Sequence, residues 1–395
     1  MSWFRQAAAV TAMNFRSIAE RKSSSLAAIV GIAGVVAVLI GIFSIAAGFR
    51  AVLELSGSDD VVVVFRGGAT DEMTSGLSQE QTRIIGDAPG VLHVSGEPVS
   101  SAELYVLLDV PLKSTGTPAN VPLRGVGTHA ASVREGFRII EGRNLQPGTN
   151  EVIVGQGAAY AFAGLDVGAE LRSGINVWRI VGIFAANGSV AESEVWSDAV
   201  VLQGVYNRGT SYQSTRARLE SASALATFKD ALTSDPRVNV RVQTEREYYA
   251  AQSRTLVTLV TVLGQTIALL MGLAAVFGAL NTMYSAVSAR TREIATLRAL
   301  GFGAFPVVAS VLTEAMLLGA LGGTAGALIA YFGFNGIRAS TMNLASFSAI
   351  TFAFTVTPAL VVQSLGYALV LGFFGGLLPS VRAARMPIVA GLRDA

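Results

Sequence analysis

Four long apolar segments, which together contain a single charged residue, constrain this chain more than any other feature. The first runs from Leu26 to Phe49, and the other three follow Arg254 in the C-terminal part. A helix of about 20 apolar residues crosses the ~30 Å hydrocarbon core of a bilayer, and each segment is long enough to do so. The residues between the first and second segments, 50–254, read as an ordinary globular sequence. The spacing therefore predicts a membrane α-helical protein with four transmembrane helices in a one-plus-three arrangement. A large α+β extracytoplasmic domain is then inserted between helices one and two.

The composition supports membrane insertion and argues against several other classes of protein. Only 14% of the residues are charged, whereas a soluble chain carries about a quarter. The net charge of +2 is too small to suggest a nucleic-acid-binding surface. The chain has no cysteine, which excludes disulfides and thiol chemistry.

Basic residues near the ends of the apolar segments predict the orientation, because arginine and lysine accumulate on the cytoplasmic side. They precede the first segment, separate the second from the third and follow the fourth: Arg5, Arg16, Arg21, Lys22, Arg290, Arg292, Arg298, Arg382, Arg385 and Arg393. Both termini and the loop of residues 290–298 are therefore expected in the cytoplasm, with residues 50–254 outside. A cleaved signal peptide is a less favoured reading of the first segment, because its apolar region would be only about 7–15 residues long.

These boundaries divide the chain into nine expected segments. They are a cytoplasmic amphipathic N-terminal helix (1–25), transmembrane helix one (26–49), an external α+β domain (50–254), transmembrane helix two (255–285), a cytoplasmic loop (286–303), transmembrane helix three (304–335), an external loop or re-entrant segment (336–357), transmembrane helix four (358–380) and a cytoplasmic tail (381–395).

Within the external domain, β-branched and alternating segments such as Val195–Leu202 predict strands, and serine-initiated segments predict helices. Asn187-Gly188 is a strong hairpin signal between two of the strands. Two helix ends, near Gly86 and Ser234, are each followed by a proline and a valine-led strand. We infer two related strand–helix–strand halves, with residues of about 120–205 as an inserted subdomain. Chance similarity of two helix ends is the alternative.

No motif in the chain predicts catalysis. Its lysines, Lys22, Lys113 and Lys229, do not follow the glycines of a phosphate-binding loop. The two histidines, His93 and His129, lack any metal-ligand spacing, and no nucleophile elbow is present. We expect no enzymatic activity, cofactor or metal in this chain.

The segment from Arg290 to Arg298 is the strongest candidate for a functional site. Arg290, Arg292, Glu293 and Arg298 are charged, and Ile294 and Leu297 share one helical face. Gly301 can end such a helix and Pro306 can open the next. The pattern predicts a short amphipathic helix that docks to a cytoplasmic partner through its apolar face. The alternative is that the arginines only anchor helix ends at the lipid headgroups.

Two polar residues fall within the apolar segments. Glu314 is the one charged residue inside the four apolar segments, and Asn281 lies near the end of the second segment. An intramembrane ionisable residue is a candidate functional position, but Glu314 lies only about two turns after Pro306. Packing against a neighbouring helix or snorkelling to the interface explains it equally well.

Residues Asn281 to Gly301, with the sequence NTMYSAVSARTREIATLRALG, resemble the signature of the MacB/FtsX family of ABC transporter permeases. The later Glu314, Gly319 and Gly322–Gly326, and the closing segment from Pro379 to Arg393, are similar to the same family. In the external domain, Glu151–Gly155 and Trp178–Phe184 resemble the family's periplasmic core.

The resemblance implies a permease subunit of the bacterial inner (plasma) membrane, with residues 50–254 in the periplasm. This subunit forms a homodimer or heterodimer and pairs with a cytoplasmic ABC ATPase, which binds ATP and magnesium. Residues 290–298 would be the coupling helix, and ATP-driven movement would be transmitted to the periplasmic domain to drive export or efflux. A fused ATPase domain, as in MacB itself, is missing before the first span, so the ATPase is expected as a separate chain, and a periplasmic adaptor is a further possible partner. A lipoprotein-releasing permease remains an alternative, as does a signalling or scaffold protein that regulates a cell-wall enzyme.

Overall fold

The computed structural model describes residues 22–343 and 348–389, and these form two compact units. One unit contains Gly48–Thr258 and Arg338–Ala353. The other contains the described parts of residues 1–47, 259–337 and 354–395. Residues 1–21 of the predicted amphipathic N-terminal helix lie outside the described residues.

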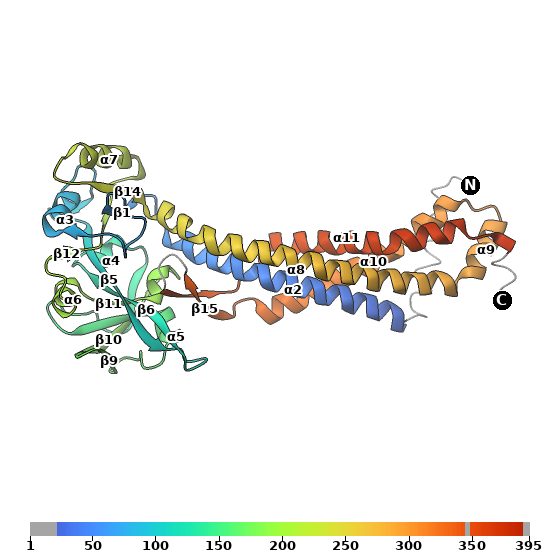
Figure 1. The fold of residues 1–395 in the computed structure, drawn as a ribbon, viewed down its shortest axis with the longest axis horizontal. Helices are drawn as coiled ribbons and strands as arrows, with labels where there is room; N and C mark the ends of the chain where they lie inside the picture. The colour runs from blue at the N-terminus through green and yellow to red at the C-terminus, as the bar shows by residue number, and fades with distance from the viewer. Residues whose placement is uncertain (1–21, 344–347, 390–395) are drawn as a thin grey trace. The chain divides into compact units, whose positions relative to one another are not determined.

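The helical unit is built from long apolar helices that lie alongside one another (Figure 1). They are α2 (Lys22–Ser56), α8 (Glu245–Ala289), α10 (Ala304–Phe334) and α11 (Pro358–Arg385). Within the described residues, these four helices are long and apolar enough to cross a membrane. Glycine allows close packing: a Cβ on Gly326 would lie 2.5 Å from the Ala33 carbonyl oxygen of α2, and one on Gly319 would lie 2.8 Å from the Ala368 carbonyl oxygen of α11. Small residues are expected at such contacts between membrane helices.

The external unit contains a sheet of two strand–helix–strand halves. The first half is β1 (Val61–Arg66), α3 (Gln79–Gly86) and β5 (Ser100–Pro111); the second is β13 (Ser214–Arg218), α7 (Leu225–Ser234) and β14 (Val240–Thr244). The strands are antiparallel in the order β14-β1-β13-β5. This is the ferredoxin-like arrangement, and it confirms the two related halves that the helix ends predict.

The chain between β5 and β13 extends the same sheet and builds a second core around Trp178 and Phe162. Its elements are β6 (Pro118–Val126), α4 (Ala130–Val133), β7 (Phe137–Gly142), β8 (Glu151–Gly155), α5 (Gln156–Ala161), β9 (Glu170–Ser173), β10 (Asn176–Ala186), η1 (Val190–Ser193), β11 (Val195–Asp198) and α6 (Ala199–Val205). Short pieces complete the unit: β2 (Leu77–Ser78), β3 (His93–Val94), β4 (Glu97–Pro98), β12 (Ser211–Tyr212) and η2 (Ala222–Ala224). Hereafter the first lobe is the ferredoxin-like part, and the second lobe is the part from Leu104 to Val205.

Two local predictions in the second lobe are wrong. The expected strand Val195–Leu202 ends at Asp198, whose carboxylate accepts hydrogen bonds from the amides of Val200 and Val201 and so begins helix α6. Asn187-Gly188 does form a turn with positive φ at both residues. It leads into η1 rather than a hairpin, because β11 pairs with β6 and β8 instead of β10.

The segment between α10 and α11 forms a hairpin of β15 (Arg338–Asn343) and β16 (Ser348–Ala353). It belongs to the external unit. The Thr351 amide donates to Ser193 Oγ at 3.0 Å, and the Asn343 side chain donates to Gln252 Oε1 at 2.7 Å. This segment is therefore a β-hairpin that packs as part of the same unit as the α+β domain.

Seven buried charged side chains meet where the two lobes join, and we call this group the ion cluster. Its members are Glu72, Glu103, Arg124, Arg134, Glu194, Arg216 and Glu245. Arg124 is central: its guanidinium contacts Glu194 at 2.7 and 2.8 Å and Glu72 at 2.6 and 2.9 Å. None of these residues attracts notice in the sequence, because each lies in a different element or loop and no motif connects them.

Acid is expected to weaken this unit. Burial alone would raise the pKa of Glu72, but the positive charges of Arg124 and Arg216 outweigh it and lower that pKa from 4.5 to about 2. Between these values the unfolded chain binds more protons than the folded one, so stability is present above pH 4.5 and is lost as the pH falls toward 2. At about 1.4 kcal/mol per pKa unit, Glu72 alone accounts for about 3 kcal/mol. Urea unfolding of the full chain in detergent, repeated across this pH range, measures the effect. A flat stability between pH 5 and pH 3 would contradict it.

Candidate functional site

The predicted short helix is α9 (Thr291–Ala299), which lies between α8 and α10. Gly301 follows it with φ +92, a conformation that glycine adopts readily, and the Gly301 amide donates to the Arg298 carbonyl oxygen. Helix α10 then begins at Ala304 with Pro306 in its first turn. Both boundary signals in the sequence are therefore confirmed.

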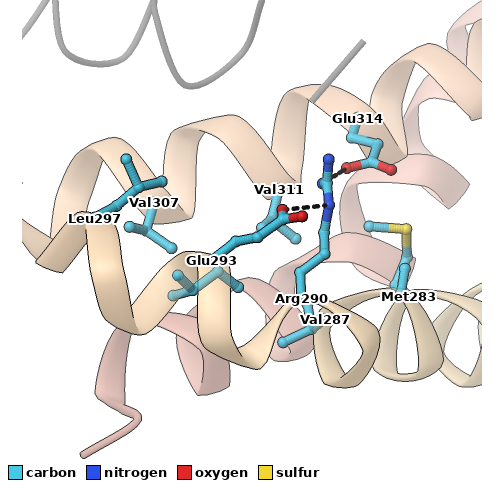
Figure 2. Close-up of a pocket in the computed structure, with 10 residues that line it drawn as sticks. Met283, Val287, Arg290, Glu293, Leu297, Val307, Val311 and Glu314 are labelled. Atoms are coloured by element: carbon cyan, nitrogen blue, oxygen red, sulfur yellow. Dashed lines mark hydrogen bonds and ion pairs between the residues drawn. The ribbon is translucent and has the colours of Figure 1, made fainter. Parts of the chain in front are cut away.

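Arg290, at the junction of α8 and α9, is buried and holds the corner together. Its Nη1 lies 3.0 Å from Glu314 Oε2 of α10, and both side chains are less than a tenth exposed. Glu293, which is more than half exposed, lies 3.6 Å from Arg290 Nε. Figure 2 shows the arginine between the two carboxylates. Glu314 thus packs against a neighbouring helix, one of the two readings that the sequence left open, and Arg290 is not a headgroup anchor.

Arg298, in the last turn of α9, makes a second connection. Its Nη1 donates to the Met386 carbonyl oxygen at 2.7 Å, directly after α11 ends at Arg385. A cation at a helix C-terminus satisfies an orphan carbonyl and interacts well with the helix dipole. Helix α9 is therefore tied to α8 by the chain, to α10 through Glu314 and to α11 through Arg298.

The apolar face of α9 is not available to a partner, which corrects the expectation from the sequence. Ile294 is buried in a core with Val287 of α8 and Val307 and Val311 of α10, and Leu297 is half-buried beside the same pocket. Periodicity shows that two residues share a face but not which neighbour covers it. Here the chain's own helices cover it.

Replacing Ile294 by aspartate is accordingly expected to destabilise the protein itself. A carboxylate in an apolar core costs about 3 kcal/mol or more unless it is paired. Thr296→Asp, at an exposed position of the same helix, is the control and should leave stability unchanged. Thermal unfolding of both variants in detergent distinguishes them. An Ile294→Asp protein as stable as the control would show that this face is not part of the core.

The outward face of α9 carries Arg292, Glu293, Thr296 and, at the residue that caps its C-terminus, Leu300. All four are exposed, and Leu300 is 73% exposed. Asn281 is exposed on α8 and does not join the Arg290–Glu314 pair. The sequence pattern did not indicate Leu300, because this residue follows the charged segment Arg290–Arg298 and does not lie within it. Among the described residues, no group of acidic or histidine side chains could hold a metal ion.

Comparison with known proteins relates each of the two units to a protein family. Residues 25–235 match the model of the MacB-like periplasmic core domain, and residues 266–388 match the FtsX-like permease C-terminal model. The "Macrolide export ATP-binding/permease protein MacB 1/2" of Paracoccus denitrificans is 25% identical over 75% of this chain and 45% of that protein. The "Pyoverdine export ATP-binding/permease protein PvdT" of Pseudomonas savastanoi pv. phaseolicola is 37% identical over 36% of this chain and 20% of that protein.

A solved structure, the periplasmic region of MacB from Actinobacillus actinomycetemcomitans, aligns with a TM-score of 0.38 at 12% identity. The alignment covers 50% of this chain and 94% of that one. The match to each curated export protein spans less than half of that protein's length. Since one family model covers more than half of the chain and a second covers most of the remainder, this chain belongs to the MacB/FtsX family of ABC transporter permeases.

Proposed function

We propose that this chain is the permease subunit of an export system, in which a separate ATPase subunit drives movement of the external domain. MacB-type permeases work with ABC ATPase partners, and the named relatives are export proteins. In this proposal the ATPase binds ATP and magnesium, and the chain itself catalyses nothing. It lies in the inner membrane with both termini in the cytoplasm and the external unit in the periplasm.

One observation carries the proposal: α9 is fastened to three long helices at once. The Arg290–Glu314 pair and the Arg298–Met386 hydrogen bond connect it to α10 and to the end of α11, while α8 runs directly into it. A force applied to α9 would therefore move these helix ends together. This is the behaviour expected of a segment that passes motion from a cytoplasmic ATPase into the membrane.

The proposed docking surface is the outward face of α9, with Arg292, Thr296 and Leu300. Its occupant is the ATPase, which the family relationship supplies. An exposed leucine on the same face as an exposed arginine resembles the apolar anchor and polar surroundings of a protein interface. Arg290, Ile294 and Leu297 then support this surface from behind, and do not contact the partner.

Changing Leu300 to aspartate is expected to abolish co-purification of the ATPase with the tagged full chain, because a charge would replace the apolar anchor. Loss of such an anchor typically costs about 2 kcal/mol or more of binding energy. Val200→Asp on α6 of the external unit is a matched control, since Val200 is 68% exposed. The control should retain the ATPase. Capture of equal amounts of ATPase by both variants would refute the docking surface.

The alternatives give different results in the same experiment. A scaffold protein that regulates a cell-wall enzyme would not retain an ATPase even as the wild-type chain. A lipoprotein-releasing permease would retain one and would differ in its cargo. Crosslinking of the purified complex then shows whether the second permease copy is identical or a sister chain.

A further inference from the structure

The ion cluster lies where strand β5 passes from one lobe to the other. Ser100–Glu103 pair with β13 of the first lobe, and Leu104–Pro111 pair with β6 of the second. Glu103 is the last residue on the first-lobe side of this change. Its carboxylate contacts Arg216 of the first lobe and Arg124 of the second, the latter at 3.0 Å.

Helix α8 enters the same cluster with its first turn. Glu245, its first residue, lies 3.4 Å from Arg216 Nε and is 8% exposed at the side chain. One turn later the Tyr248 hydroxyl donates to Glu72 Oε2 at 3.5 Å, and its ring packs on Phe65 of β1 at 5.4 Å between centroids. From Glu245, charges of alternating sign continue through Arg216, Glu103 and Arg124 to Glu194 of the second lobe.

Stability alone does not account for burying so many charges. Replacing a buried ion network with apolar side chains of similar size is often neutral or stabilising, because desolvation offsets the Coulombic attraction. What such a network provides is a defined geometry, since its hydrogen bonds are satisfied in only one arrangement. That geometry here involves the first lobe, the second lobe and the start of α8.

We propose that the ion cluster is the joint that makes the first turn of α8 rigid with the second lobe, so that movement of α8 turns that lobe. Glu245 and Tyr248 act as positioning residues, and Arg216, Glu103 and Arg124 relay the constraint. This inference rests on the proposed function, because it assigns the route by which motion of a membrane helix reaches the second lobe.

Distance measurement between α8 and the second lobe tests the joint. The chain has no cysteine, so spin labels at Arg254→Cys on α8 and Arg172→Cys on β9 mark only these positions, both of which are exposed. In the full chain in lipid nanodiscs, we expect one narrow distance population. Glu245→Gln removes the charge with little change of shape and should replace this population with a broad one.

Asp59→Asn is the matched control. Asp59 pairs with Arg246 in the same turn of α8 at 2.7 Å, but both side chains are more than half exposed. The narrow population should survive in this variant. A narrow population in Glu245→Gln, or a broad one in the wild-type chain, would overturn the proposal. If Glu245→Gln does not unfold cooperatively, Tyr248→Phe is measured instead. This variant removes the contact to Glu72 and retains the aromatic ring.

Adding nucleotide distinguishes a failure of this inference from a failure of the proposed function. With the co-purified ATPase and Mg-ATP, the label distance in the wild-type chain should shift, and Glu245→Gln should lose the shift. A wild-type chain that keeps its narrow population and does not move with ATP would refute the proposed function and leave the joint standing. A wild-type shift that Glu245→Gln reproduces would refute the joint alone.

Discussion

Replacing Arg124 by methionine is expected to lower the stability of the external unit by about 3–5 kcal/mol, the usual cost of removing one partner from a buried ion pair. The loss is large because Arg124 directly contacts three carboxylates, those of Glu72, Glu103 and Glu194. Without Arg124, less positive charge offsets the electrostatic repulsion between these buried carboxylates. Such a loss approaches the whole stability of many domains.

Tryptophan fluorescence measures this effect during urea unfolding of the full chain. Trp196 Nε1 donates to Glu194 Oε2 at 2.8 Å, so its ring is bonded directly to the ion cluster. Arg143→Met is the control, because Arg143 forms an exposed pair with Glu151, and such pairs contribute about 0–1 kcal/mol. If both variants unfold at the same urea concentration, the ion cluster does not hold the unit together.

Replacing Arg290 by methionine is expected to loosen the corner between α8, α9 and α10. It leaves Glu314 buried without the guanidinium that lies 3.0 Å away, and the expected loss is about 3 kcal/mol or more. Amide hydrogen exchange in α9 should therefore accelerate. Arg292→Met, two residues further on and exposed, should leave exchange unchanged.

A double variant makes this prediction specific to the pair. Arg290→Met with Glu314→Met removes both charges, and most of the lost protection should return. The coupling energy from such a cycle is typically about 0.5–3 kcal/mol for residues in direct contact. Additive losses would mean that the two side chains do not act as a pair, and the tie between α9 and α10 would have to be sought elsewhere.

The two charged assemblies have related roles in the proposed transport cycle. The Arg290–Glu314 pair and Arg298 hold α9 to the helices that would carry its motion, while the ion cluster holds the start of α8 to the external unit. Each lies at a junction where separate secondary-structure elements must keep a fixed geometry. Packing alone specifies such angles less sharply than a set of hydrogen-bonded charges does.

The sequence predicted α9 and its boundaries well because those signals are local. Gly301 must accommodate a positive φ, and the charges from Arg290 to Arg298 alternate with apolar residues at helical spacing. The prediction that a partner covers the apolar face of α9 was wrong, because the element that covers this face depends on how the helices pack in three dimensions. Ile294 meets Val307 and Val311, residues that no periodicity connects to it.

By itself the sequence determined the four apolar helices, the α+β external domain and the family, because length, hydropathy and short motifs are properties of contiguous residues. Only the tertiary structure decided that Arg290 pairs with Glu314 and that seven isolated charges form one cluster. Charged side chains that contact one another in this cluster are separated by up to 144 positions, as between Glu72 and Arg216, and they meet only through the order of strands in the sheet. A buried charge is tolerated only when such partners surround it, so its role becomes visible when the fold brings them together.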